Sequence, residues 1–144
     1  MVRLVDVYAP EIHSEAIGFL FEMLQERHPD VNISHKVMPS FEAHLEFINS
    51  KPYAAWYIVM NGEGTPLGNV YLTGFNEIGI FITKSAQKRG LGRKAIDELI
   101  KRHPKTCYYA NISPRNQRSI AIFERMGFRQ IQVSFKLDMP SCCN

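Results

Sequence analysis

The clearest chemical signal in the chain is the six-residue stretch Gln-Lys-Arg-Gly-Leu-Gly at residues 87–92. It follows an apolar run at residues 78–83 and precedes an amphipathic stretch at 93–102, which predicts a strand, a turn and a helix. Backbone N–H groups at a helix start lack intrahelical partners, and the helix dipole adds partial positive charge there. Glycines let a ligand approach the main chain. Four cations lie at this turn, namely Lys88, Arg89, Arg93 and Lys94. The turn therefore predicts a site for a phosphate or pyrophosphate group.

Two other interpretations of the turn have less support. Gly90 and Gly92 could simply permit a tight turn, but the surrounding cations, with no acid between residues 84 and 96, argue for more than that. A dinucleotide fingerprint formally fits, since Ala95 completes the pattern GxGxxA. That fingerprint needs an acid about 20 residues further on to bind the ribose, and residues 109–112 contain none. A Walker loop is excluded because the chain has no GxxxxGK[ST] pattern.

Taken with its flanks, the pattern Gln87-x-x-Gly90-x-Gly92 resembles the acyl-CoA pyrophosphate motif of the GNAT N-acetyltransferases. A second stretch, residues 116–128, resembles another signature of that family through Asn116, Ser119, Ile120, Phe123, Glu124, Gly127 and Phe128. Ser119 and Glu124 bring the resemblance nearest to the branch that acetylates ribosomal proteins and amino sugars. Residues 40–47 are similar to the same branch, though less closely.

Periodicity predicts strands at residues 2–8, 53–60, 67–75, 78–83, 106–112 and 128–137, and helices at 11–27, 40–49, 93–102 and 117–126. Only the strands at 78–83 and 106–112 are joined by a helical crossover of the length that parallel pairing needs. We therefore expect a mixed sheet in an α/β or α+β fold. The resemblance implies about six to seven strands with about four helices, and a splayed strand pair that binds acyl-CoA. One N-acetyltransferase domain would occupy residues 1–138, with a flexible tail at 139–144.

The resemblance also implies which residues bind acetyl-CoA. The backbone of the splayed strand would pair with the pantetheine arm, and the glycine turn would surround the pyrophosphate. Asn116 would bond the pantetheine, while its alternative role is to cap the helix that follows. The implied cofactor-binding residues are Ile80, Phe81, Ile82, Gln87, Lys88, Arg89, Gly90, Leu91, Gly92, Arg93, Asn116, Ser119 and Phe123.

The groups that move protons cannot be carried over from the family. Many members have a tyrosine acid where this chain has Phe123, and some have a glutamate base where it has Asn111. We expect Glu77, at the start of the splayed strand, to be the catalytic base, with His35 and His44 next because imidazole titrates near neutral pH. Tyr57, Tyr71 and Tyr109 alternate along strands and are interpreted as core or sheet-face residues. The acceptor pocket would lie between the first two helices and the polar loop at residues 28–39.

These features predict an acetyl-CoA-dependent N-acetyltransferase that acts on a primary amine, with an amino sugar nucleotide favoured over a protein N-terminus or small amine. A non-catalytic acyl-CoA-binding module is the alternative. The net charge of +3 is too small to indicate nucleic acid, and no apolar run approaches the ~18 residues of a membrane span. Three cysteines without a CxxC spacing predict no metal site or disulfide framework and a reducing, cytoplasmic compartment. A monomer and a homodimer both remain open.

Overall fold

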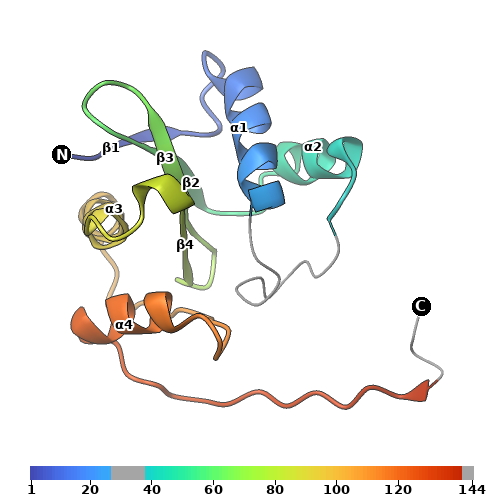
Figure 1. The fold of residues 1–144 in the computed structure, drawn as a ribbon, viewed down its shortest axis with the longest axis vertical. Coiled ribbons are helices and arrows are strands. Elements are labelled where there is room, and N and C mark those ends of the chain that lie inside the picture. Colours follow the sequence, from blue (N-terminus) through green and yellow to red (C-terminus); the bar gives the residue numbers. More distant parts are fainter. Residues whose placement is uncertain (27–37, 141–144) are drawn as a thin grey trace.

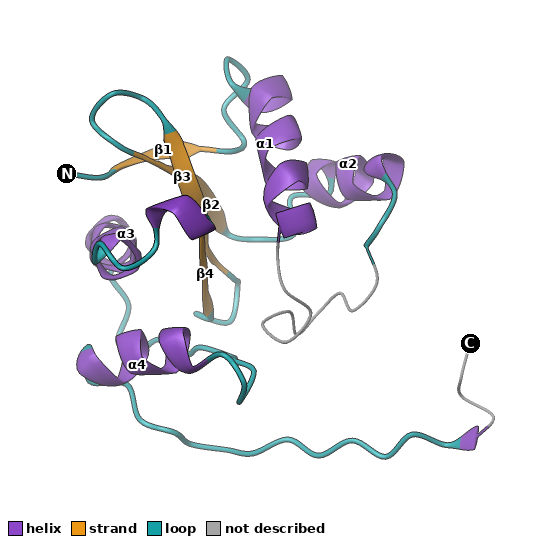
Figure 2. Ribbon diagram, viewed as in Figure 1, coloured by secondary structure: helices purple, strands orange, loops and turns teal. Residues whose placement is uncertain are grey.

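A four-stranded antiparallel sheet, in the order β1-β2-β3-β4, forms the centre of the computed structural model, which describes residues 1–26 and 38–140. Figure 1 shows the course of the chain and Figure 2 its helices and strands. The elements, in chain order, are β1 (Arg3–Asp6), α1 (His13–Glu26), α2 (Phe41–Asn49), β2 (Ala55–Met60), β3 (Pro66–Leu72), β4 (Ile78–Ile82), the short 3₁₀ helix η2 (Lys84–Ala86), α3 (Leu91–Arg102) and α4 (Gln117–Arg125).

Successive side chains of a strand point to opposite faces of the sheet, so apolar residues lie on both faces. Helices cover each face. On one face, Val59 of β2 and Val70 of β3 pack with Ile96 and Leu99 of α3. On the other face, Trp56 and Ile58 of β2 pack with Ile17 and Leu20 of α1 and with Ile48 of α2. β4 contributes to both clusters, through Ile80 on the α3 side and Phe81 on the side of α1 and α2.

Three predicted helix boundaries, the starts of α2 and α4 and the end of α4, are confirmed by their caps, whereas α1 begins at His13 and α3 at Leu91 instead of residues 11 and 93. The Ser40 hydroxyl accepts from the Ala43 N–H at 3.1 Å, and the Asn116 side chain accepts from the Ser119 N–H at 3.2 Å. Gly127 follows α4 with φ 97°, a left-handed conformation that glycine adopts without steric cost. The local sequence signals for these three boundaries therefore agree with the structure.

The prediction of a mixed sheet with six to seven strands is wrong for the described residues. The segment at 106–112 makes one isolated parallel bridge, between Tyr109 and Glu77, and forms no regular strand. The segment at 128–137 alternates apolar and polar residues as a strand would, but no described element pairs with it. Alternation of apolar and polar residues shows that a segment is able to form a strand. A regular strand also needs a neighbouring strand to complete its backbone hydrogen bonds.

The polar loop expected to line an acceptor pocket lies largely outside the described residues, and His35 with it. Its last residues, Met38 and Pro39, are described and lead into the cap of α2. No described helix is long and apolar enough to span a membrane.

Candidate functional site

The strand before the glycine turn has one paired edge and one largely open edge. β3 pairs with β4 from Leu72↔Ile78 to Gly68↔Ile82. On the other edge, the Ile78 N–H donates to the Tyr109 carbonyl at 2.7 Å and the Tyr109 N–H donates to the Asn76 carbonyl at 2.9 Å. Beyond Ile78 the described chain shows no further bridge on that edge. β4 is therefore bridged to the 106–112 segment only at its start, and the splayed strand pair stays a prediction.

Backbone directions along β4 follow from its register. Alternate residues of an antiparallel strand point their N–H and C=O groups to opposite edges. The Glu77 carbonyl bonds Thr73 of the β3 side, whereas the Ile78 N–H faces Tyr109. Ile80 and Ile82 therefore direct their backbone groups to the open edge, and Phe81 directs its own toward Asn69 of β3.

The glycine turn joins the end of β4 to the N-terminus of α3. The Gln87 Nε2 donates to the Ile82 carbonyl at 2.9 Å, so that Gln87 is tied to the end of the strand. Lys88 and Gly90 both have positive φ, 69° and 72°. Gly90 is the N-cap of α3 and provides no side-chain acceptor for the first N–H groups of the helix. Those N–H groups lack intrahelical partners and remain available to an anion.

The two glycines of the turn have different roles. A Cβ at Gly90 would meet nothing within 4 Å, so this position is open to solvent or to a ligand. A Cβ at Gly92 would lie 3.2 Å from the Ile122 Cδ1 of α4, because Gly92 is buried. Gly92 thus permits close contact between α3 and α4. The sequence predicts only that this glycine lets a ligand approach the main chain, and it does not indicate the contact with α4.

Positive charge surrounds the N-terminus of α3. Lys88, Arg89, Arg93 and Lys94 are all exposed. Arg93 approaches Asp97 on the same helix, with 4.0 Å between Nε and Oδ2, and both side chains are about half exposed. A surface pair of this kind contributes little stability and leaves the arginine able to bind an anion. Leu91, the hydrophobic residue of the turn, instead packs with Leu67 and Ala86.

The second signature lies on α4, beside α3. Asn116 caps α4 through its Oδ1, and its Nδ2 remains a hydrogen-bond donor group. Ser119 is half-buried in the first turn of the helix. Phe123 is only 3% exposed and its ring meets Phe128 edge-on at 4.9 Å. Asn116 and Ser119 are thus the more accessible of the three, while the Phe123 ring belongs to the core.

Glu77 is held at the point where β4 and the 106–112 segment meet. Its Oε1 accepts from the Thr73 Oγ1 at 3.0 Å, and its Oε2 accepts from the Asn111 Nδ2 at 2.5 Å. The side chain is half-buried. Sequence reasoning missed the partnership with Thr73 and Asn111, although Thr73 and Glu77 flank a three-residue turn at which a threonine hydroxyl commonly forms local hydrogen bonds.

Aromatic residues cover the sheet beside Glu77, on the face toward α1 and α2. Tyr53 stacks on Tyr71 with ring centroids 3.8 Å apart and planes 5° apart. The Tyr71 ring lies over Gly79, where a Cβ would come 2.0 Å from its Cζ. Tyr109, bridged to Glu77, is 43% exposed. A hydrogen bond from Cys107 raises the pKa of the Tyr109 hydroxyl, so the phenol stays protonated at neutral pH.

Tyr57 and His44, which the sequence analysis also considered, lie away from Glu77 and the glycine turn. Tyr57 contacts His103 on the α3 side, 2.8 Å from the hydroxyl to Nε2. His44 is 6% exposed and its ring packs beside Phe21 at 5.4 Å, between α1 and α2. Within residues 1–26 and 38–140, no cluster of three or more His, Cys, Asp or Glu side chains could bind a metal ion.

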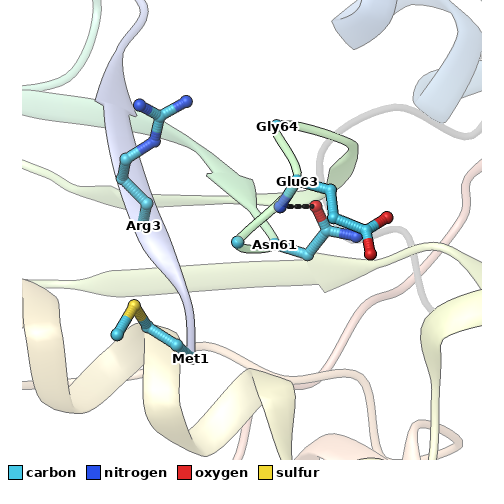
Figure 3. Close-up of a pocket in the computed structure, with 6 residues that line it drawn as sticks. Met1, Arg3, Asn61, Glu63 and Gly64 are labelled. Carbon is cyan, nitrogen blue, oxygen red and sulfur yellow. Dashed lines mark hydrogen bonds between the residues drawn. The ribbon is translucent and has the colours of Figure 1, made fainter.

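A surface pocket lies apart from this site. Figure 3 shows it between the start of β1 and the β2–β3 turn, lined by Met1, Arg3, Asn61, Gly62, Glu63 and Gly64. The Glu63 and Thr65 N–H groups both donate to the Asn61 side chain at 2.9 Å, so the polar groups of the turn bond one another. The pocket shares no residue with the glycine turn or with the surroundings of Glu77.

Comparison with known proteins identifies relatives of this arrangement. The model of the acetyltransferase (GNAT) family matches residues 17–128, well over half of the chain. No curated protein matches the sequence. Among solved structures, spermidine N-acetyltransferase from Vibrio cholerae, in complex with CoA and spermine, has a TM-score of 0.74 at 16% identity, with 91% of this chain and 82% of that chain covered.

Two further solved structures resemble the chain. Phosphinothricin acetyltransferase from Sinorhizobium meliloti, in complex with acetyl-CoA, has a TM-score of 0.63 at 23% identity. The match covers 89% of this chain and 75% of the phosphinothricin acetyltransferase chain. The ribosomal L7/L12 α-N-protein acetyltransferase RimL, in complex with CoA, has a TM-score of 0.66 at 16% identity. The match covers 88% of this chain and 79% of the RimL chain. At these identities the likeness establishes the fold.

Proposed function

Because the chain belongs to the GNAT acetyltransferase family, we propose that it transfers an acetyl group from acetyl-CoA directly to a primary amine. The observation that carries this proposal is the open edge of β4, followed through η2 and the glycine turn by the N-terminus of α3, which has exposed cations around it. An extended thiol arm can pair with such an edge as an added strand would, and a pyrophosphate can bind at the helix start.

The residues proposed to bind acetyl-CoA divide into three groups. Ile80, Phe81 and Ile82 form the strand beside the pantetheine arm, with the backbone groups of Ile80 and Ile82 on the open edge. The turn from Gln87 to Arg93 surrounds the pyrophosphate with N–H groups and cations. Asn116 and Ser119 are proposed to contact acetyl-CoA from α4, and Phe123 supports α4 from the core.

Glu77 is proposed as the base that removes a proton from the ammonium form of the acceptor. The neutral amine attacks the thioester carbonyl and forms a tetrahedral oxyanion, which a backbone N–H on the open edge stabilises. The C–S bond then breaks, and the thiolate takes up a proton. Tyr109 is bridged to Glu77 through the backbone, and we propose its hydroxyl, which accepts from the Cys107 thiol, as the proton donor in place of the tyrosine missing at Phe123.

The carboxylate of Glu77 favours a cationic amine as acceptor, since a carboxylate attracts positive charge. An amino sugar nucleotide is the first acceptor to test, followed by a protein N-terminus. The solved relatives named above act on spermidine, phosphinothricin and a ribosomal protein, respectively, so the fold accommodates several amine classes.

The proposal is tested by calorimetric titration of acetyl-CoA into the wild type and two glycine variants. Gly90→Glu places a carboxylate where the pyrophosphate would bind, and we expect it to raise Kd more than about tenfold, or ~1.4 kcal/mol. Gly64→Glu is the matched control, because Gly64 also has positive φ (83°) and open surroundings but lies in the β2–β3 turn. We expect the control to bind as the wild type does.

Turnover separates an enzyme from a binding module. If acetyl-CoA binds, thiol release should then be followed with amino sugar nucleotides, amino-terminal peptides and polyamines as acceptors. Release with at least one amine, lost in Glu77→Gln, supports catalysis. Binding without release on any amine would favour the non-catalytic acyl-CoA module, and no binding by the wild type at millimolar acetyl-CoA would overturn both.

A further inference from the structure

Gly79 lies inside β4, and the space beside it is filled by a residue of β3. A Cβ at Gly79 would overlap the Cζ and the hydroxyl oxygen of Tyr71. Tyr71 is the register partner of Gly79, so both residues face the same side of the sheet. A glycine inside a strand often marks a place where another group approaches the backbone closely. The Tyr71 hydroxyl therefore occupies the position that a side chain at residue 79 would have.

The face of β4 on which this hydroxyl lies also carries Glu77. Phe81 packs against the cluster formed with α1 and α2, whereas Ile78 belongs to the cluster formed with α3. Because side chains alternate along a strand, Glu77 and Gly79 share the face of Phe81. Tyr71 packs against the cluster on that face as well. β4 thus presents a carboxylate at position 77 and a phenol hydroxyl at position 79 on one face, beside its open edge.

The Tyr71 ring is fixed by its aromatic neighbours, whereas its hydroxyl is unused. The ring stacks on Tyr53 with centroids 3.8 Å apart, and Tyr53 meets Trp56 edge-on at 4.8 Å. The Trp56 Nε1 donates to the Asn69 Oδ1 at 3.1 Å, so the indole is held in turn. Among the residues that the structure describes, none forms a hydrogen bond with the Tyr71 hydroxyl. A phenol that is fixed in place and has a free donor and acceptor is suited to bind a substrate.

The spacing of the carboxylate and the hydroxyl suits a single nitrogen atom. Positions two apart along a strand are separated by roughly 6.5–7 Å. A nitrogen that forms a hydrogen bond of ~3 Å to an oxygen on either side joins two oxygens about 6 Å apart. The carboxylate of Glu77 and the hydroxyl over Gly79 can therefore bind the same amine.

We propose that the Tyr71 hydroxyl binds the nitrogen of the acceptor amine and orients it for attack, an inference that rests on the proposed function. One N–H of the amine donates to the Tyr71 oxygen, and Glu77 removes another proton. The nitrogen lone pair forms the new bond to the acetyl carbon, and the electron pair of the broken C–S bond goes to sulfur. The nitrogen loses two protons in all: Glu77 takes the first, and the second balances the proton that the thiolate acquires. The acceptor therefore enters on the face of β4 that α1 and α2 cover.

Tyr71→Phe tests the hydroxyl alone, because phenylalanine keeps the ring and its stack on Tyr53. Thiol release from acetyl-CoA is followed with an amino sugar nucleotide, a peptide with a free α-amino group and spermidine as acceptors. With an acceptor that the wild type uses, kcat/KM for the amine should fall roughly 10- to 100-fold, the effect of losing a hydrogen bond to a charged group. Kd for acetyl-CoA and the thermal midpoint should not change.

Tyr57→Phe is the matched control, because it removes a tyrosine hydroxyl from the opposite face of the same sheet. The Tyr57 hydroxyl lies on the α3 side, 2.8 Å from the His103 Nε2. We expect this variant to retain the wild-type kcat/KM for the amine.

A methylated acceptor separates binding of the amine from support of the fold. The N,N-dimethyl analogue of the acceptor, in its ammonium form, has one N–H for the carboxylate of Glu77 and none for Tyr71. Calorimetry with CoA in place of acetyl-CoA gives Kd for both compounds without turnover. The wild type should bind the primary amine more tightly than the analogue, and the ratio of the two Kd values should fall about tenfold in Tyr71→Phe.

Each result decides between the role of Tyr71 and the proposed function. Equal kcat/KM in Tyr71→Phe and the wild type, or an unchanged ratio of Kd values, would overturn the role of Tyr71 and leave the acetyl transfer standing. A loss of acetyl-CoA affinity as large as the loss of kcat/KM would also overturn it, because the hydroxyl would then support the fold. Wild-type protein that releases no thiol with any acceptor would overturn the proposed transfer and this inference together.

Discussion

The Asn111 side-chain amide donates to the carboxylate of Glu77, with 2.5 Å between Nδ2 and Oε2, across the gap where β4 separates from the following segment. Thr73 donates to the other carboxylate oxygen at 3.0 Å. Two donors from different elements therefore fix the orientation of one half-buried acid. Asn111 stands where some family members have a glutamate base. Its amide orients Glu77, which we propose as the base in this chain.

Replacing Glu77 with glutamine should lower kcat by about 10²- to 10⁴-fold, the usual contribution of a general base. Kd for acetyl-CoA should not change, because Glu77 lies outside the glycine turn. Steady-state kinetics and calorimetry on the same preparation separate the two quantities. Glu63→Gln is the matched control, since Glu63 is an exposed acid of the remote pocket in Figure 3. Equal kcat in Glu77→Gln and the wild type would eliminate Glu77 as the base.

Asn116 caps α4, and we propose that it also binds acetyl-CoA; one substitution can separate the two roles. Asn116→Asp keeps the oxygen that accepts from the Ser119 N–H, but it removes the Nδ2 donor and adds negative charge. We expect the free energy of unfolding to stay close to that of the wild type while Kd for acetyl-CoA rises. Asn116→Ala removes the cap as well and should cost about 1 kcal/mol of stability. Chemical denaturation measures stability, and wild-type affinity in Asn116→Asp would restrict Asn116 to capping.

Gly68 of β3 lies opposite Ile82, the last residue of β4. A Cβ there would lie 2.1 Å from the Phe81 carbonyl oxygen, a backbone atom that cannot rotate away. Gly68→Ala should therefore destabilise the fold by roughly 1–3 kcal/mol, and it should weaken acetyl-CoA binding because β4 must shift.

Gly74 provides the control for that substitution, because a Cβ there would meet nothing within 4 Å. Gly74→Ala should leave the thermal midpoint and Kd close to their wild-type values. Equal stability of the two alanine variants would show that β3 and β4 tolerate a wider separation than this structure has.

The glycine turn and the helix boundaries could be predicted from the sequence because their signals are local. Ser40, Asn116 and Gly127 act through bonds or backbone angles within a few residues, which a sequence window contains. The extent of the sheet could not be predicted in this way. Whether residues 128–137 become a strand depends on a neighbour far along the chain or in another molecule, and alternation alone does not identify that neighbour.

In the candidate site too, residues in short motifs could be predicted from the sequence, whereas contacts between residues far apart in the chain could not. Gln87, Gly90 and Asn116 could be singled out from motif spacing, because each acts at the end of a helix or strand that periodicity locates. The contact between Glu77 and Asn111 joins residues 34 positions apart, and it required the register between β4 and the 106–112 segment. The role of Gly92 in packing against Ile122 was similarly hidden, because it depends on how α4 crosses α3.

The final prediction concerns His103 at the end of α3, which is independent of the candidate site. Burial lowers the pKa of the His103 imidazole, and the neighbouring charges of Lys105 and Arg102 lower it further. In the neutral ring, Nε2 can accept from the Tyr57 hydroxyl, 2.8 Å away. The unfolded chain therefore binds a proton here at a higher pH than the folded chain does.

The sign of the effect follows from that difference. His103 contributes its full stability above its unfolded pKa of about 6.5, and this contribution is lost as pH falls through the lowered folded pKa. We expect the free energy of unfolding, measured in urea between pH 7.5 and pH 5 (~0.5-unit steps), to decrease on the acid side. His103→Gln should flatten that decrease, whereas Tyr57→Phe should retain most of it because burial is the larger cause. Parallel curves for the wild type and His103→Gln would show that protonation of His103 does not govern acid stability.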